Sequence, residues 1–460
     1  MIWATTAGTG KGGEIHIKVE NLQILKNGAI NSNSSSTGSG GEIQIEAQQL
    51  HMDTGGQITS MALDQGNAGN ILLQIDNLLL ANGAQINASS KSNGQGGAIT
   101  VTVTDTANFF GQSEDEEITP SGIASSAFGK GNGGTIQLTV ETLNLDKRGT
   151  VQTLTKGEGK SGNIIIHVKD LNITEGGDID ASNEGTGQSK GGDVIINATG
   201  KVFITAELHE GEFLGGIYSS AENDGAGGDI SLTTEQLTLK QGGSVSAASN
   251  GSGDAGHLTL NINDTLKIEE AGQINTSTQN AAGGNISLSI PNLLYLHDGQ
   301  ITTSVKGGKG DGGNIAISPP TFVIMNGGKI IAQANEGHGG NINIKSDQFI
   351  TSTNSLISAS SKFGIDGEII IDSPDTDIGG KLFVLETDMA NAADQLKDSC
   401  NSRIADNLST LTLIQTEGVH KPPDDLLPSQ PIFFTPKPLK LQATKRYNNK
   451  LLAQAGCRLK

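Results

Sequence analysis

The chain has 460 residues, of which 64 are glycine, and only 3% are aromatic. Apolar residues make up 34% and charged residues 17%, so an ordinary compact core would be thin for this length and disorder has to be weighed first. The formal net charge of −19 disfavours nucleic acid as a partner, because phosphate binding requires a basic surface.

The sequence shows neither a membrane span nor a disulfide framework. No stretch approaches the roughly 18 apolar residues of a membrane span, so we do not expect an integral membrane protein. The first residues, Met1 to Thr6, lack the basic and apolar regions of a signal peptide. Cys400 and Cys457 are the only cysteines, and two thiols cannot staple a fold of this size.

A glycine-rich repeat runs through the first 377 residues. Each unit begins with a pair of small residues that ends in glycine, mostly Gly-Gly, followed by apolar residues that alternate with polar ones. We call the second glycine of the pair the anchor glycine; these are Gly13, Gly41, Gly69, Gly97, Gly134, Gly162, Gly192, Gly228, Gly256, Gly284, Gly313, Gly340 and Gly367. Most intervals are 27 to 30 residues, and two are longer, with 37 and 36 residues.

An apolar landmark residue follows the anchor glycine in every complete unit. The offset is 17 residues for Ile30, Ile58, Ile86, Val151, Ile179, Val245, Ile301, Ile330 and Ile357, and 18 residues for Ile274. The two long units have their landmarks at Ile123 and Ile217, and their extra residues lie before these positions. A flexible Gly/Ser linker would not keep such a register, so the pattern indicates a folded repeat.

Each unit predicts three short β-strands. In the first, Ile15, Ile17 and Val19 alternate with polar residues; the second contains Leu22 and Ile24, and the third contains Ile30. Glycine pairs are expected at corners, because glycine reaches positive φ at little cost. One unit cannot bury its apolar side alone, so the units must stack. The sequence therefore predicts an all-β, right-handed parallel β-helix, or β-solenoid, of about 13 coils.

The predicted β-helix covers residues 1–377, and residues 378–460 form a C-terminal capping segment and a tail rich in proline and lysine. One face of a short helix in this segment is predicted from Met389, Ala393, Leu396, Cys400 and Ile404. The stretch 421–440 is expected to be extended and poorly ordered, as is typical of proline-rich sequence. Ile2 precedes its anchor glycine in the same register as Ile86, so the chain begins inside a coil. We therefore expect it to be the C-terminal part of a longer protein.

The repeats resemble those of secreted proteins of the filamentous haemagglutinin family, especially their glycine-rich forms. The segments that carry the resemblance are Gly283 to Leu288, Asp298 to Ile301, Gly251 to Leu260, the inserts ending in Pro120 to Ile123 and Leu214 to Ile217, and the C-terminal pair Cys400 to Arg403 and Gly418 to Pro423. The resemblance covers about residues 2 to 425. Nothing in the chain matches the N-terminal secretion domain of that family.

This resemblance implies the structural shaft of a secreted or surface-displayed bacterial adhesin, exported through an outer-membrane transporter of the two-partner type. The expected location is extracellular or associated with the outer membrane, and the expected partner is a host or neighbouring cell surface or a glycan. A polysaccharide-active β-helix enzyme or a carbohydrate-binding protein is the alternative. The chain is expected not to be an enzyme, and no cofactor is expected, because no carboxylate cluster with Arg or Lys stands out.

Three groups of residues are candidates for a catalytic or metal-binding site. Gly337-His338-Gly339 resembles a polygalacturonase motif, but the other elements of that motif are missing, so His338 is expected in an exposed turn. Glu114, Asp115, Glu116 and Glu117 could supply calcium ligands, yet consecutive acids usually form a solvated loop, so no metal site is assigned. The scattered histidines do not provide metal-ligand spacing.

The two inserts are the candidate contact loops, since they leave the same corner of coils three steps apart. The candidate contact residues are Phe109, Phe110, Glu114, Asp115, Glu116, Glu117, His209 and Phe213. Surface loops whose phenylalanines fold back onto the solenoid remain the alternative. Cys400 and Cys457 are a candidate disulfide if the protein reaches an oxidising compartment, and a free buried Cys400 is equally compatible with the sequence.

Overall fold

The computed structural model describes residues 1–114, 118–186, 188–209 and 212–374, and within residues 207–214 it describes only the backbone. Residues 1–376 form one compact unit. The predicted capping segment and tail, with Cys400 and Cys457, lie outside the described residues, as do Asp115, Glu116 and Glu117.

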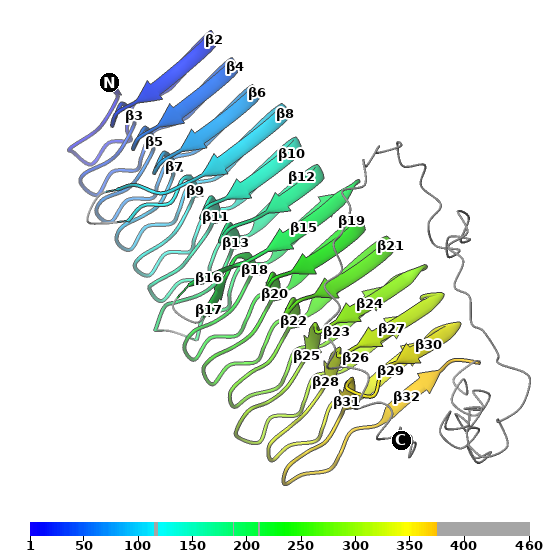
Figure 1. The fold of residues 1–460 in the computed structure, drawn as a ribbon. Coiled ribbons are helices and arrows are strands. Elements are labelled where there is room, and N and C mark those ends of the chain that lie inside the picture. The colour runs from blue at the N-terminus through cyan, green and yellow to red at the C-terminus, as the bar shows by residue number, and fades with distance from the viewer. Residues whose placement is uncertain (115–117, 187, 210–211, 375–460) are drawn as a thin grey trace, which may run out of the picture. The chain divides into compact units, whose positions relative to one another are not determined.

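The described chain is an all-β solenoid whose coils stack in chain order (Figure 1). Short strands of two or three residues form one parallel sheet of 13 strands. They are β1 (Ile2–Trp3), β3 (Ala29–Asn31), β5 (Gln57–Thr59), β7 (Gln85–Asn87), β9 (Gly122–Ala124), β11 (Thr150–Gln152), β13 (Asp178–Asp180), β18 (Gly216–Tyr218), β20 (Ser244–Ser246), β22 (Gln273–Asn275), β25 (Gln300–Thr302), β28 (Lys329–Ile331) and β31 (Leu356–Ser358). The predicted fold class, a β-solenoid of about 13 coils, is confirmed.

Longer strands form the second parallel sheet. Eight coils each contribute one strand of 10 to 12 residues: β2 (Ile15–Leu25), β4 (Ile43–Asp53), β6 (Ile71–Ala81), β8 (Ile99–Phe110), β10 (Ile136–Asp146), β12 (Ile164–Ile173), β19 (Ile230–Lys240) and β21 (Leu258–Glu269). The expected three short strands per unit are therefore wrong for these coils, in which the first two strands are one.

In the remaining coils this strand is divided. The pairs are β14 (Val194–Ala198) with β15 (Lys201–Thr205), β23 (Ile286–Ser289) with β24 (Leu293–His297), β26 (Ile315–Ser318) with β27 (Phe322–Asn326), and β29 (Ile342–Lys345) with β30 (Gln348–Thr351), while β32 (Ile369–Asp372) ends the sheet. Pro291 and the pair Pro319-Pro320 lie at two of these breaks. Proline has no N–H to donate to the neighbouring coil, which accounts for the interruption there.

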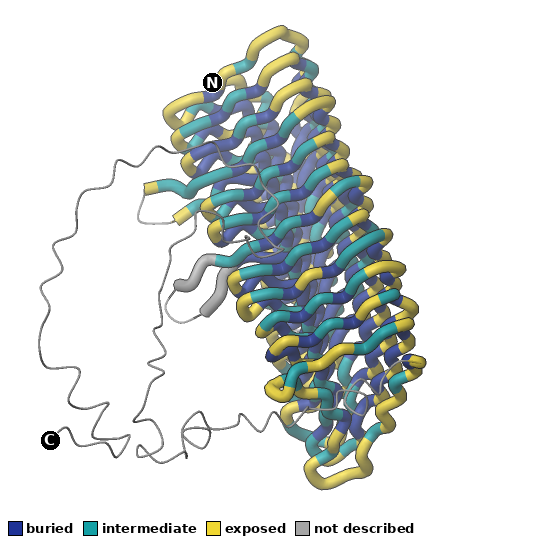
Figure 2. Tube along the Cα trace, turned by 45° about the vertical axis from the view of Figure 1, so that its right-hand side comes forward, coloured by how far each residue is buried: buried dark blue, intermediate teal, exposed yellow. Residues whose placement is uncertain are grey.

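The landmark residues pair with one another from coil to coil, as the spacing predicts. Ile30 lies opposite Ile58, and Ile58 lies opposite Ile86, in continuous parallel register. Figure 2 shows the result as a buried interior that runs along the stack beneath an exposed surface. The 18-residue offset of Ile274 also has a structural cause. The strand β21 pairs with β19 through a register shift that leaves one extra residue in β21, as in a β-bulge.

The anchor glycines are required by close approach of the backbone, not by positive φ as the sequence suggested. None of them has a left-handed φ, whereas a Cβ built on Gly162 would lie 2.0 Å from the carbonyl oxygen of Gly134. Most left-handed residues occur at a different corner, between the long and the short strand, for example at Asn27 and Gly55. A column of glycines therefore allows successive coils to touch at one corner.

Small hydroxyl residues close the interior beside these glycines. The Ser125 hydroxyl donates a hydrogen bond to the carbonyl oxygen of Gly97 (2.5 Å), and the Thr153 hydroxyl donates to that of Gly162 (2.7 Å). Ser125 and Thr153 are fully buried. The hydroxyls therefore satisfy carbonyl groups that the tight corner removes from water.

Replacing an anchor glycine in the middle of the stack is expected to destabilise the fold strongly. In Gly162→Ala the new methyl group meets only backbone atoms, which cannot move aside without separating two coils. We expect the free energy of unfolding, measured in urea, to fall by about 2–3 kcal/mol. Gly10→Ala is the control, because no atom lies within 4 Å of a Cβ at that position. Equal stability of the two variants would contradict this account of the anchor glycines.

Candidate functional site

A ladder of asparagine side chains lies on the outer face of the long-strand sheet. Asn108 of β8, Asn144 of β10 and Asn172 of β12 occupy one column of the parallel register. The side-chain amide of Asn144 donates to Oδ1 of Asn108 (2.7 Å), and that of Asn172 donates to Oδ1 of Asn144 (2.8 Å). Identical register from coil to coil therefore converts three separated asparagines into one continuous row.

The ladder forms part of a groove with a volume of about 450 Å³. The lining residues are Leu79, Asn108, Phe109, Phe110, Asn144, Asp146, Asn172 and Thr174. Phe110 is half-buried and alternates along β8 with Phe109, whose side chain is fully buried. Phe109 is therefore a core residue and not the contact residue proposed from the sequence. Phe110 remains at the surface, but it belongs to the strand and not to the loop.

The groove carries little charge. Its one carboxylate in the described residues, Asp146, accepts a hydrogen bond from the hydroxyl of Thr174 (2.7 Å). Phe203 of β15 continues the asparagine column directly after Asn172 and is also half-buried. The column thus changes from amides to an aromatic ring within one coil step.

The two inserts leave their coils between the long and the short strand, as expected. In the first, Gln112 and Pro120 form an antiparallel bridge, and Glu114 is exposed. In the second, β16 (Glu207–His209) and β17 (Glu212–Leu214) form an antiparallel hairpin. His209 and Phe213 belong to these two strands, but their side chains lie outside what the structure describes.

Two half-buried aspartates of β13 form an acidic pair that sequence reasoning missed. Asp178 accepts a hydrogen bond from the hydroxyl of Thr150, and Asp180 accepts one from the backbone N–H of Ser182 (2.8 Å). Burial, followed by the charge of Asp180, raises the pKa of Asp178 to about 7. Burial also raises the pKa of Asp180 to about 6. Desolvation opposes ionisation of both carboxyl groups, and a second negative charge nearby adds to the cost.

Tyr218 of β18 lies next to this pair, opposite Asp180 in the register. Its hydroxyl donates to the carbonyl oxygen of Gly215 (3.0 Å), at the base of the second insert. Burial and the neighbouring aspartates raise the pKa of Tyr218. An Asp-x-Asp pair on a strand could have been read as two side chains on one face, but nothing in the sequence showed that this face would be partly covered.

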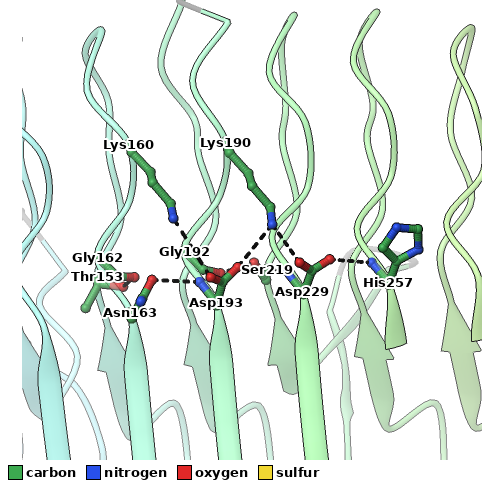
Figure 3. A network of polar contacts seen from close by, with 10 residues as sticks. All are labelled: Thr153, Lys160, Gly162, Asn163, Lys190, Gly192, Asp193, Ser219, Asp229 and His257. Carbon is green, nitrogen blue, oxygen red and sulfur yellow. Dashed lines mark hydrogen bonds and ion pairs between the residues drawn. The ribbon is translucent and has the colours of Figure 1, made fainter. Parts of the chain in front are cut away.

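A second ladder runs along the corner that follows the anchor glycines (Figure 3). Each side chain accepts a hydrogen bond at Oδ1 from the backbone N–H of the equivalent residue in the next coil. Asn163 accepts from Asp193 (3.0 Å), and Asp193 accepts from Asp229 (3.1 Å). Asp229 in turn accepts from His257 (2.8 Å). Lys190 bridges the two aspartates, with Nζ 3.2 Å from Asp193 and 2.7 Å from Asp229. Burial acts to raise the pKa of Asp229, but the hydrogen bonds from Lys190 and His257 outweigh it and lower this pKa.

His338 lies at a similar corner position. Its backbone N–H donates to Oδ1 of Asp311 (2.7 Å), and its Nδ1 lies 3.0 Å from the same oxygen. The side chain is 63% exposed, in agreement with the expected turn. These contacts lower the pKa of Asp311. The arrangement joins two coils, and among the described residues no second carboxylate makes a hydrogen bond to the imidazole.

Within the part of the chain that the structure describes, no three His, Cys, Asp or Glu side chains cluster in a way that could hold a metal ion. Among the same residues, no helix has the length and hydropathy needed to cross a membrane. The chain matches no protein-family model, no curated protein and no solved structure. The groove and the acidic pair are thus assigned from this structure alone.

The corner ladder predicts a difference between two substitutions of Asp229. Asp229→Ala leaves the N–H of His257 without its acceptor, so we expect the free energy of unfolding to fall by about 1 kcal/mol. Asp229→Asn keeps an oxygen at Oδ1 and loses only an exposed ion pair, at a cost of a few tenths of a kcal/mol or about none. Urea unfolding checks both. If Asp229→Asn lowered the free energy of unfolding as much as Asp229→Ala, the ion pair and not the ladder would stabilise this corner.

The acidic pair predicts that Asp178→Asn stabilises the protein at high pH. Well below pH 3.8 the carboxyl group is protonated in the folded and the unfolded chain, and it has no effect on the pH dependence. Between pH 4 and 7 the unfolded chain ionises first, because folding raises the pKa of Asp178 from 3.8 to about 7. Stability is therefore lost over this range as the pH rises.

We expect Asp178→Asn to raise the free energy of unfolding at pH 8 by roughly 1–2 kcal/mol and to change it much less at pH 4, where the unfolded carboxyl group has only begun to gain from ionisation. Urea unfolding at the two pH values measures the difference. Asp105→Asn on the exposed face of β8 is the control and should change neither value. A variant that gains equally at both pH values would show that the effect is not due to ionisation.

Proposed function

We propose that this chain is the structural shaft of a secreted or surface-displayed bacterial adhesin, and that it acts without catalysis. The observation that supports this best is the unbroken parallel register of the short sheet, from β1 to β31. At about 4.8 Å per coil, the twelve steps of this sheet span roughly 58 Å. A stack of this kind holds its outer side chains in fixed rows, which suits a protein that makes many weak contacts along a rod.

The resemblance to filamentous haemagglutinin-like exoproteins supports the same proposal. The resemblance also implies export through an outer-membrane pore of the two-partner type and an extracellular or surface location. The inserts and the groove beside Phe110 are surface features that differ from coil to coil, and they would give such a shaft its specificity.

A polysaccharide-active enzyme is the weaker candidate. Glycoside hydrolysis requires two carboxyl groups that reach the scissile bond from either side. Asp178 and Asp180 have the raised pKa values expected of such groups, but their hydrogen bonds to Thr150 and Ser182 hold them in the strand. The groove on the other sheet has a single carboxylate among the described residues, which favours binding over bond cleavage.

Surface labelling of intact cells tests the proposal. Antibodies raised against residues 1–374 should label the organism that encodes the chain without permeabilisation, and external protease should remove the signal. Deleting the gene should reduce attachment of these cells to other cells or to surfaces. An antigen found only after lysis would overturn the proposed location, and unchanged attachment would overturn the adhesin role. A cytosolic protein measured in the same samples controls for leakage.

A further inference from the structure

We propose that the groove of Leu79, Asn108, Phe110, Asn144, Asp146, Asn172 and Thr174 binds a neutral polysaccharide chain. This inference rests on the proposed function, because it names the class of ligand that an adhesin shaft would contact. It assigns the contact to the strand face and not to the tips of the two inserts.

The first argument is the hydrogen-bonding capacity left in the ladder. Each amide nitrogen has two N–H groups and each amide oxygen has two lone pairs. In Asn144, one N–H is donated to Asn108 and one lone pair accepts from Asn172. One donor and one acceptor therefore remain on Asn144, held in a fixed orientation by the ladder. A ligand that bonds to them does not have to immobilise the side chain, which lowers the entropic cost of binding.

The second argument is periodicity. The amides repeat once per coil, at about 4.8 Å along the axis. A polymer of similar repeating units can place equivalent groups on successive amides, whereas a small molecule can engage only part of the row. Sugar hydroxyls both donate and accept hydrogen bonds, so they match a row that offers at least one of each per coil.

The third argument is the position of the aromatic rings. Phe110 lines the groove beside the amides, and Phe203 continues the amide column after Asn172. Both rings are half-buried, so each has an exposed part supported by its neighbours. Only 3% of the residues are aromatic, so a surface ring in the groove and a second one in the coil after Asn172 are a specific feature. The apolar faces of sugar rings can pack on them while the hydroxyls reach the amides.

The fourth argument concerns charge. Asp146 is the only ionisable residue among the described residues that line the groove, and the chain as a whole carries a net charge of −19. A polyanion would meet repulsion without a cationic partner in the groove. The ligand class is therefore a neutral polysaccharide and not a uronic acid polymer or a sulfated glycan.

Binding of the full chain to immobilised polysaccharides tests the assignment. The neutral probes are amylose, laminarin, xylan, galactan and mannan, and the acidic probes are polygalacturonate, alginate and heparin. We expect at least one neutral polymer to be retained, with weak dependence on salt. Asn144→Ala and Phe110→Ala should each weaken this binding by about tenfold, since one interrupts the ladder and the other removes the ring.

Two matched variants control for effects outside the groove. Asn261→Ala removes an exposed asparagine from the same sheet, and Phe128→Ala removes a partly exposed phenylalanine that contacts Lys91. Both should bind within twofold of the parent protein. All four variants are compared at equal folded fraction by circular dichroism and thermal unfolding.

The possible results separate this inference from the proposed function. Retention of none of the neutral probes, a preference for the acidic ones, or binding that is unaffected by Asn144→Ala and Phe110→Ala would each overturn the groove assignment. If surface labelling of intact cells still succeeds, the adhesin proposal stands and only the groove falls. If labelling fails while groove-dependent binding persists, the groove assignment stands and the adhesin proposal falls.

Discussion

Parallel pairing of each coil with the equivalent residues of the next coil is the constraint on which the rest of this structure depends. The pairing requires the backbones to approach closely at one corner, where a single Cβ on Gly162 would lie 2.0 Å from a carbonyl oxygen of the preceding coil. Anchor glycines supply that space, and buried hydroxyls such as those of Ser125 and Thr153 satisfy the carbonyl groups nearby. The apolar stripe of each coil is then covered by the same stripe of its neighbours, and no unit is stable alone.

The same pairing determines what the surface can do. A side chain at a given position is carried to the same place in every coil, so polar residues form rows. Asn163, Asp193 and Asp229 use such a row to accept backbone N–H groups at the corner. Asn108, Asn144 and Asn172 use another row to bond to one another on the outer sheet. The side chains of the first row bond to the backbone of the next coil, whereas those of the second row keep unused donors and acceptors that can bond to a ligand.

Departures from the repeat make single coils different from the others. The two inserts, the extra residue in β21 and the proline breaks near Pro291 and Pro319 each change a single coil, and the parallel pairing resumes beyond each of them. The acidic pair of β13 is a different departure. Asp178 and Asp180 occupy positions that are polar in many coils, and their burial makes them costly to ionise. A one-dimensional stack tolerates such local costs because each coil contacts only its neighbours.

The sequence by itself determined the repeat length, the register of the landmark residues and the parallel β-helix, because periodicity along the chain directly reports which residues are equivalent. It also located both inserts. The tertiary structure alone decided why glycine is required at Gly162, since close contact with another coil is not a local property of the chain. Likewise, only the tertiary structure shows that Phe109 lies in the core and that Asn108, Asn144 and Asn172 form one ladder. These asparagines are 36 and 28 residues apart, and only stacking in register places their amides within hydrogen-bond distance.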